Sequence, residues 1–197
     1  MELRPATPEQ LETVYDADLK VSFPAAELKP LRIIQRMLED GYYRPWCLFD
    51  GAEIVGECFL WLGEPGWALL DYLCISPRCR NGGLGALLLE KMLEAEPGVV
   101  ILGESEMPEY APDPAMAQRR LGFYARNGAR TAGYDTEMFG VPYKTLYWAE
   151  GKVDESALME EHRFVYASTF APDKFRRYVR IPFDPNGTPG ERVSWQQ

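Results

Sequence analysis

Arg80-Asn81-Gly82-Gly83-Leu84-Gly85 is the stretch that decides the fold of this chain. The run 69–77 before it is rich in apolar residues and is typical of a β-strand. After it, apolar residues recur at the spacing of an amphipathic helix: Leu84, Leu87, Leu88, Met92 and Leu93. A glycine-rich turn between a strand and a helix leaves backbone N–H groups unpaired, and the helix dipole adds partial positive charge. Arg80 adds a formal charge and a bidentate donor. The stretch therefore predicts a phosphate-binding turn at the start of a helix.

A glycine-rich turn of this kind has three alternative interpretations. A Walker loop ends in Gly-Lys-Ser/Thr, but here Ala86-Leu87 follows the glycines, which excludes it. A dinucleotide-binding turn needs an acidic residue about 20 positions on, near Glu104, but the glycine spacing and the position after a hairpin disfavour it. A purely structural turn, with glycines for close packing, stays open.

Two motifs resemble those of a known family. Leu73-x-Ile75-x-Pro77 followed by Arg80-x-x-Gly83-x-Gly85 resembles the acyl-CoA signature of the GNAT N-acetyltransferase superfamily. Downstream, and in the family's order, the run 123–128 (Phe-Tyr-Ala-Arg-Asn-Gly) resembles its Phe-Tyr-x-x-x-Gly segment. The resemblance covers residues 1–150. It departs from the family at Gly82, where many members carry Lys, Arg or Gln, and at Ala129, where an aromatic residue is usual.

The resemblance implies an α/β (α+β) fold, with a mixed, mostly antiparallel central sheet flanked by helices in the order β-α-α-β-β-β-α-β-α-β-β. Periodicity and turn residues give the same order. The expected strands are 2–5, 43–50, 53–62, 67–75, 99–104, 129–135 and 142–149, and the expected helices are 7–20, 30–40, 84–95 and 115–126. We therefore expect an acetyltransferase domain over 1–150 and a helical C-terminal extension over 151–197. In the extension, Asp154 caps a helix, a helical turn follows at 172–178, and the end from Pro185 is expected to be disordered.

Composition excludes several classes of function. The 197-residue chain has a net charge of −9, which opposes nucleic-acid binding and favours a cationic acceptor. It has no apolar stretch suited to secretion or to crossing a membrane, so we expect a cytoplasmic protein. The cysteines form no CxxC pair, and His162 is the only histidine, so no metal site and no Ser-His-Asp chemistry are expected: Cys47, Cys58, Cys74 and Cys79.

The resemblance implies acetyl-CoA as cosubstrate and places its contacts on the main chain. The backbone of Asn81 to Ala86 is expected to hold the diphosphate, and the edge of the strand at 73–75 is expected to bind the pantetheine arm and polarise the carbonyl. The cofactor-binding candidates are thus Leu73, Cys74, Ile75, Arg80, Asn81, Gly82, Gly83, Leu84, Gly85 and Ala86.

The resemblance also places Tyr124 beside the CoA sulfur as general acid, because a phenol with a pKa near 10 is protonated at neutral pH. The alternative interpretation is that Tyr124 is a structural residue of the hydrophobic core. The candidate bases are Asp71, Glu104 and Glu106, with Glu27 as a further pocket residue. Asp71 shares strand parity with the residues of the pantetheine edge, and the two glutamates alternate on one face at a strand end. A solvated acidic rim is the alternative for these two.

The leading interpretation is direct transfer of an acetyl group from acetyl-CoA to a primary amine of a small, cationic acceptor. A non-catalytic module that senses acyl-CoA is one alternative. A protein-interaction role through the extension is the other. The extension itself is interpreted as a packing appendage, with a lid over the acceptor pocket or a homodimer contact as the alternatives.

Overall fold

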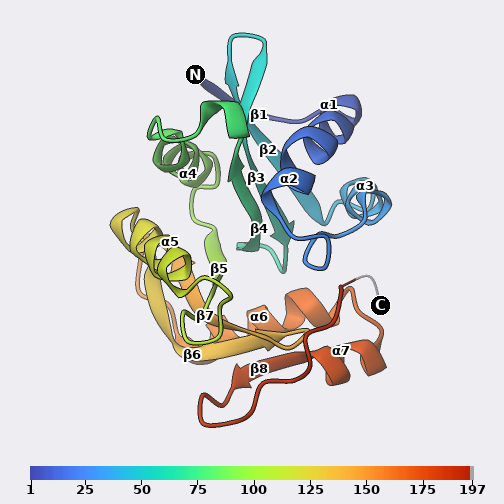
Figure 1. Ribbon diagram of the computed structural model, residues 1–197, viewed down its shortest axis with the longest axis vertical. Helices are drawn as coiled ribbons and strands as arrows, with labels where there is room; N and C mark the ends of the chain where they lie inside the picture. The colour runs from blue at the N-terminus through green and yellow to red at the C-terminus, as the bar shows by residue number, and fades with distance from the viewer. Residues whose placement is uncertain (196–197) are drawn as a thin grey trace. The chain divides into compact units, whose positions relative to one another are not determined.

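The computed structural model describes residues 1–195. These residues form two compact units. The first unit comprises Met1–Leu62, Leu70–Pro97 and the chain from Ser194, and the second comprises Gly63–Leu69 and Gly98–Val193. Residues on both sides of position 150, from Gly98 to Val193, belong to the second unit. The domain boundary at residue 150 stays a prediction. Each unit contains strands with helices beside them (Figure 1).

Four strands form the sheet of the first unit, in the order β1-β2-β3-β4. They are β1 (Glu2–Pro5), β2 (Tyr43–Asp50), β3 (Glu53–Leu62) and β4 (Trp67–Ile75), of which residues 70–75 belong to this unit. β1 pairs antiparallel with β2, and β2 pairs antiparallel with β3. The turn between β2 and β3 lies at Gly51, whose φ of 61° suits the hairpin signal Asp50-Gly51.

Helices lie beside these strands, with α4 on one side and α1 to α3 on the other (Figure 1). They are α1 (Pro8–Val14), α2 (Lys20–Ser22), α3 (Leu31–Glu39) and α4 (Leu84–Ala95). α1 begins with a capping box, in which the side chains of Thr7 and Gln10 each accept a hydrogen bond from the other residue's backbone N–H. Between them, the core of the unit holds fully buried side chains: Leu11, Ile34, Leu48, Phe59, Trp61 and Leu88.

The expected helix 7–20 is interrupted by a π-helical segment, Tyr15–Leu19, and helical structure continues to Ser22, where the sequence predicts a break. The wider turn directs Asp18 inward, where its side chain accepts a hydrogen bond from Ser76 Oγ at 2.9 Å. Periodicity did not reveal the π segment because it changes the helical repeat over one turn only.

The second unit has four strands in the order β5-β7-β6-β8. They are β5 (Val100–Glu106), β6 (Arg130–Met138), β7 (Val141–Trp148) and β8 (Val179–Phe183), and the neighbouring strands pair antiparallel. The helices are α5 (Pro114–Arg126), α6 (Glu155–Ala167) and α7 (Pro172–Tyr178). The fold class and the predicted order of elements over 1–150 are confirmed.

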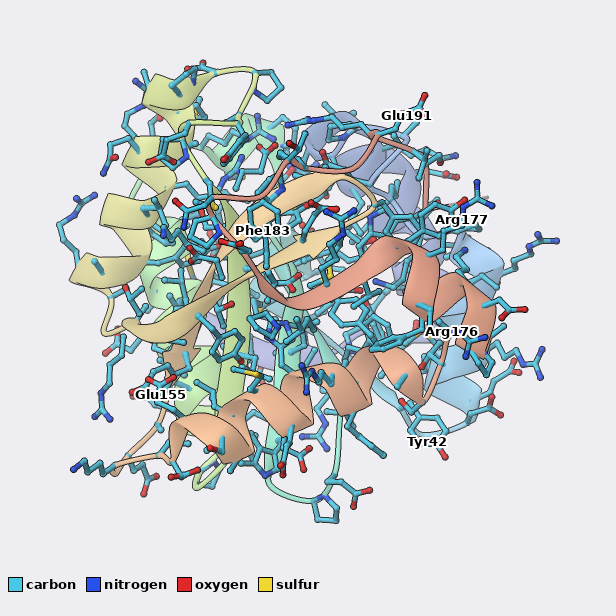
Figure 2. All side chains as sticks on the ribbon, turned by 90° about the horizontal axis from the view of Figure 1, so that it is seen from below. Tyr42, Glu155, Arg176, Arg177, Phe183 and Glu191 are labelled. Atoms are coloured by element: carbon cyan, nitrogen blue, oxygen red, sulfur yellow. The ribbon has the colours of Figure 1, made fainter. Side chains whose placement is uncertain are left out.

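The extension contains more than helices. Asp154 caps α6 as predicted, but β8 was not foreseen and pairs with β6, with Met138 opposite Val179. Arg180 lies on this strand, two residues after the expected helical turn at 172–178, whereas Arg176 and Arg177 are exposed on α7 (Figure 2). A short strand of alternating residues directly after a helix gives a weak signal.

The end of the chain differs from the predicted disorder. The amide of Val193 donates to the carbonyl of Phe139 at 3.1 Å, and the guanidinium of Arg192 donates to the carbonyl of Tyr110 at 2.7 Å. The backbone from Pro185 is irregular but bonded up to these positions. The rest of the prediction concerns residues 196–197, which lie outside the described residues.

Candidate active site

The glycine turn opens α4 directly after β4 and a short 3-10 turn, Pro77–Cys79. Asn81 and Gly83 both have left-handed backbones, with φ of 69° and 76°. Gly83 is the N-cap of α4, and no side chain among residues 1–195 caps this helix. Because the first N–H groups of a helix lack intrahelical acceptors, this uncapped end presents donors for an anion. Asn81, Gly82 and Gly83 are exposed.

Arg80 braces the turn. Its Nε donates to the carbonyl of Ile75 at 3.2 Å, and its terminal nitrogen donates to Ser22 Oγ at 2.8 Å. Arg78 donates to the carbonyl of Ile54 at 3.1 Å. Two arginines, Arg78 and Arg80, therefore lie next to the start of α4 and make this part of an acidic protein locally basic.

The expected pantetheine edge, Leu73 to Ile75, is the last part of β4. Cys74 is buried, its Sγ donates to Glu57 Oε2 at 2.9 Å, and burial raises the pKa of its thiol. A Cβ on Gly56 of β3 would lie 2.6 Å from Ile75 Cδ1 and 3.1 Å from the carbonyl oxygen of Cys74, so β3 approaches this part of β4 closely at a residue without a side chain. The Cys74 side chain is therefore a packed thiol, whereas Leu73 and Ile75 on either side of it are partly exposed.

Asp71, on the same strand, is nearly buried and bonded on both oxygens. Lys29 Nζ lies 2.6 Å from Oδ1, and the hydroxyl of Tyr43 donates to Oδ2 at 2.5 Å. Burial raises the pKa of Tyr43 well above its usual value, so its hydroxyl stays a donor. This carboxylate thus already binds an ammonium group, although that ammonium belongs to the chain itself.

In the second unit, Glu104 of β5 is bonded by α6 of the extension. His162 Nε2 lies 2.8 Å from Glu104 Oε1, and the hydroxyl of Tyr166 donates to Oε2 at 2.7 Å. His162 is fully buried, and its Nδ1 lies 3.2 Å from the hydroxyl of Tyr134. Two residues on, Glu106 faces Arg120 and Arg192 at 3.7 and 3.6 Å. The two glutamates therefore do not form a simple solvated rim, because each has defined partners.

Tyr124 lies on the last turn of α5 and is partly exposed. Its ring packs edge-on against Phe123 and Trp148, with centroids 5.3 and 5.6 Å away. Trp148 is held by a hydrogen bond from its Nε1 to the carbonyl of Asn127 at 2.9 Å. The aromatic contacts fix the ring of Tyr124 on one side of the helix.

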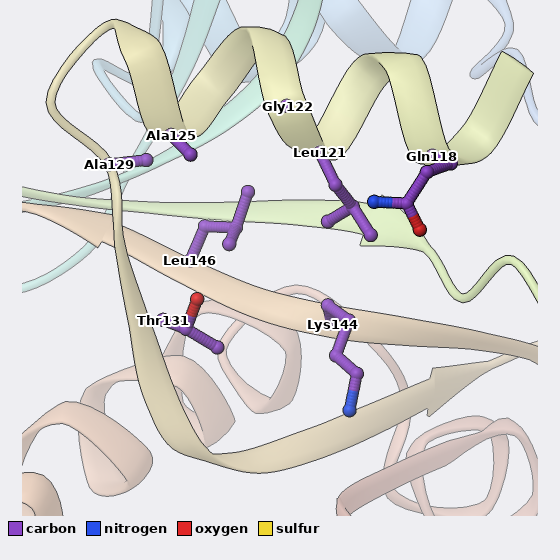
Figure 3. A pocket seen from close by; sticks show the side chains of 8 residues that line it. All are labelled: Gln118, Leu121, Gly122, Ala125, Ala129, Thr131, Lys144 and Leu146. Atoms are coloured by element: carbon purple, nitrogen blue, oxygen red, sulfur yellow. The ribbon is translucent and has the colours of Figure 1, made fainter.

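A hollow of about 310 Å³ lies under the C-terminal half of α5 (Figure 3). It is lined by Gln118, Leu121, Gly122, Ala125, Ala129, Thr131, Lys144 and Leu146. Ala129 is the position where the sequence departs from the family's aromatic residue. The small side chain at 129, together with Gly122 and Ala125, leaves this space between α5 and the strands β6 and β7.

Two groups that contact the candidate carboxylates could not be predicted from the sequence, His162 and Lys29. His162 was noted only as too isolated for metal or triad chemistry, and nothing in its spacing points to Glu104. Lys29 carried no signal at all, because a lysine before a proline in a loop is ordinary.

Within residues 1–195, no group of three or more His, Cys, Asp or Glu side chains is arranged to hold a metal ion. No described helix is both long and apolar enough to span a lipid bilayer.

The family model described as "Acetyltransferase (GNAT) family" matches residues 9–126, more than half of the chain, so this protein belongs to the GNAT acetyltransferase family. A search of curated proteins finds no relative. Among solved structures, a putative GNAT-family acetyltransferase from Bacteroides thetaiotaomicron is similar, with a TM-score of 0.67 and 21% identity over 83% of this chain and 95% of that one.

Two further solved structures share the fold. Spermidine N-acetyltransferase from Vibrio cholerae, in complex with CoA and spermine, has a TM-score of 0.59 at 13% identity, over 76% of this chain and 95% of its own. A GNAT-like decarboxylase in complex with isobutyryl-CoA has a TM-score of 0.58 at 20% identity, over 76% and 99%. At these identities the likeness concerns the fold. Both complexes contain CoA or an acyl-CoA.

Proposed function

We propose that this protein is an acetyl-CoA-dependent N-acetyltransferase that transfers the acetyl group directly to a primary amine of a small, cationic acceptor. The observation that carries the proposal is the uncapped, glycine-rich start of α4, with left-handed backbone at Asn81 and Gly83 and Arg80 braced beside it. Such a turn binds a diphosphate through main-chain N–H groups. CoA-bound neighbours of the same fold support acyl-CoA as the ligand.

In this proposal each cofactor candidate keeps its expected role. The backbone from Asn81 to Ala86 binds the diphosphate, and the main chain of Leu73 to Ile75 binds the pantetheine arm and polarises the thioester carbonyl. The reacting amine gives a proton to a carboxylate and attacks the carbonyl carbon. The carbon–sulfur bond then breaks, and the CoA thiolate takes a proton from Tyr124. The second proton of the amine, which leaves as the amide forms, restores the Tyr124 hydroxyl.

Glu104 and Glu106 are the proposed carboxylates for the acceptor. Glu104 keeps both oxygens oriented through His162 and Tyr166, which favours a defined role over that of a mobile surface charge. The net charge of −9 and the spermine bound to one neighbour both support a cationic acceptor. The four cysteines are free, which agrees with a protein that works in the cytoplasm.

CoA titration by thermal shift tests the cofactor part. Saturable binding raises the melting temperature by mass action. We expect the shift to vanish in Arg80→Glu and Gly83→Asp and to persist in Glu53→Gln, an exposed position on β3. A shift that survives both loop variants would place CoA elsewhere.

Thiol release from acetyl-CoA in the presence of an amine library, including spermidine, tests the reaction. Tyr124→Phe should lower turnover about 100-fold while CoA affinity is kept, because the general acid is lost and the aromatic packing is not. CoA binding without turnover on any amine would favour the alternative of a non-catalytic acyl-CoA sensor.

A further inference from the structure

Lys29 is a lysine that the fold encloses. It lies between α2 and α3, in the first unit, and only 4% of its surface is exposed. Its amide donates to the hydroxyl of Tyr72 at 2.8 Å, and its carbonyl accepts from the hydroxyl of Tyr15 at 2.8 Å. Two tyrosines therefore fix the backbone on both sides of the residue, so the direction of its side chain is set by the fold.

The ammonium of Lys29 is surrounded as proteins surround a bound ammonium ligand. Its Nζ lies 2.6 Å from Asp71 Oδ1, 4.4 Å from the ring centroids of Trp61 and Trp195, and 5.5 Å from that of Tyr72. A carboxylate combined with several aromatic faces recognises a cation by charge and by cation–π attraction. We call these four residues the ammonium cage: Trp61, Asp71, Tyr72 and Trp195.

A contribution to folding stability does not by itself account for the ammonium cage. A buried ion pair loses the hydration of both charges, and well-packed apolar side chains of similar volume are often equally stable or better. Lys20 shows what an ordinary lysine does in this unit: it pairs with Asp16 at 2.6 Å and lies over the ring of Tyr15, yet 56% of its side chain is exposed. The ammonium group of Lys29 differs from that of Lys20 because it is removed from water and held in one direction by the residues around it.

Asp71 also lies on the strand to which the proposed function assigns the thioester. Leu73 is two residues further along β4, about 7 Å away at the rise of a strand. We propose that Lys29 is itself an acetyl acceptor, so that the enzyme modifies its own chain at this position. This inference rests on the proposed function, because it needs acetyl-CoA bound along Leu73 to Ile75.

The chemistry balances without a further reactant. The Lys29 ammonium gives one proton to Asp71 along the existing hydrogen bond, and the neutral amine attacks the thioester carbonyl. A carbon–nitrogen bond forms, the carbon–sulfur bond breaks, and CoA leaves as a thiolate that takes up a proton. The second ammonium proton leaves the nitrogen as the amide forms, and it is the proton that the thiolate takes up. The product is a neutral amide, so acetylation removes both the ion pair and the cation–π contacts of the cage.

The experiment needs only the full-length protein and acetyl-CoA. A glutamate-specific protease cuts after Glu12, Glu27 and Glu39, and so puts Lys20 and Lys29 on separate peptides, 13–27 and 28–39. Mass spectrometry of these peptides over time measures acetylation at each lysine in the same sample. Lys20 is the matched control, because it has a carboxylate and a ring as neighbours but is open to solvent.

We expect Lys29 to be acetylated at least about tenfold faster than Lys20, because it is held in place and has a base at hand. The rate should not depend on protein concentration. Asp71→Asn should slow the modification of Lys29 but not that of Lys20, while Lys20→Arg should leave modification of Lys29 unchanged. Circular dichroism and the CoA-induced thermal shift show whether the Asp71→Asn variant is folded and binds CoA.

Acetylation of Lys20 that equals or exceeds that of Lys29 would overturn the inference, since it would mark a non-enzymatic reaction with exposed amines. An unmodified Lys29 in a protein that binds CoA and acetylates an amine from the library would overturn it as well, and the proposed function would stand. A protein with neither CoA binding nor turnover fails at the proposed function itself, and the inference falls with it.

Discussion

The imidazole Nε2 of His162 lies 2.8 Å from Oε1 of Glu104, and it joins the C-terminal extension to a candidate base on β5. His162 is fully buried in α6, and its other nitrogen lies 3.2 Å from the hydroxyl of Tyr134. The extension is therefore not a passive appendage in the second unit. It supplies the groups that orient Glu104.

Replacing His162 tests this relationship. His162→Leu removes a polar partner from a nearly buried carboxylate, so we expect a loss of about 1 to 3 kcal/mol in the free energy of unfolding. His162→Gln keeps an amide donor and should recover part of that loss. Urea denaturation measures both. Equal stability of the leucine variant and the native protein would show that Glu104 does not depend on this contact.

Gly83 and Gly82 form a matched pair for the glycine turn. Gly83 has φ of 76° and open space around it, so Gly83→Ala should cost about 1 kcal/mol through backbone strain alone. Gly82 has no positive φ, and an added Cβ would meet only the carbonyl of Cys79 at 3.8 Å, so Gly82→Ala should be nearly neutral.

Chemical denaturation of the two glycine variants, with and without CoA, separates stability from binding. We expect the CoA-induced gain in stability to shrink in Gly83→Ala and to persist in Gly82→Ala. A gain that shrinks equally in both would contradict the assignment of the left-handed position as the one that shapes the anion site.

Glu57 predicts a pH dependence of stability. Burial raises its pKa to about 8, from 4.5, because the charged form would lose its hydration within the first unit. The folded state thus keeps a proton that the unfolded chain releases, and the free energy of unfolding falls as pH rises from 4.5 to about 8. Each pKa unit corresponds to roughly 1.4 kcal/mol.

Glu57→Gln should remove this loss, because glutamine is neutral at every pH and can still accept from Cys74. Relative to the native protein, the variant should therefore gain stability as pH rises through that window. Urea unfolding at a series of pH values measures the slope. Glu53→Gln on the same strand is exposed and should leave the slope as it is. An unchanged slope in Glu57→Gln would mean that the carboxyl is ionised in the folded state.

Much of the fold could be predicted from local signals. The strands at 43–50 and 53–62, the start of the first helix at Thr7 and the apolar stripe of α4 each depend on neighbours a few residues apart, and each was found at its predicted place. The strand β8 was not predicted, because its partner β6 lies far away in the sequence and its own alternating pattern covers only a few residues. The same reason explains the candidate site. The turn that contains Gly83 could be predicted from neighbouring residues. The contacts of Lys29 with Asp71 and of His162 with Glu104 could not, because they join residues 42 and 58 positions apart.

Ala129 gives the last test, because a departure from a family pattern coincides with a hollow in the structure. The space under α5 has apolar walls at Leu121, Ala125 and Leu146 (Figure 3). Ala129→Phe should place a ring in this space and raise the free energy of unfolding by about 1 kcal/mol, as other cavity-filling changes do. Ala115→Phe, on the exposed first turn of α5, should bring no gain. Differential scanning calorimetry compares the two. If Ala129→Phe is no more stable than Ala115→Phe, then the hollow is not missing an aromatic side chain, and the departure at 129 has another cause than packing.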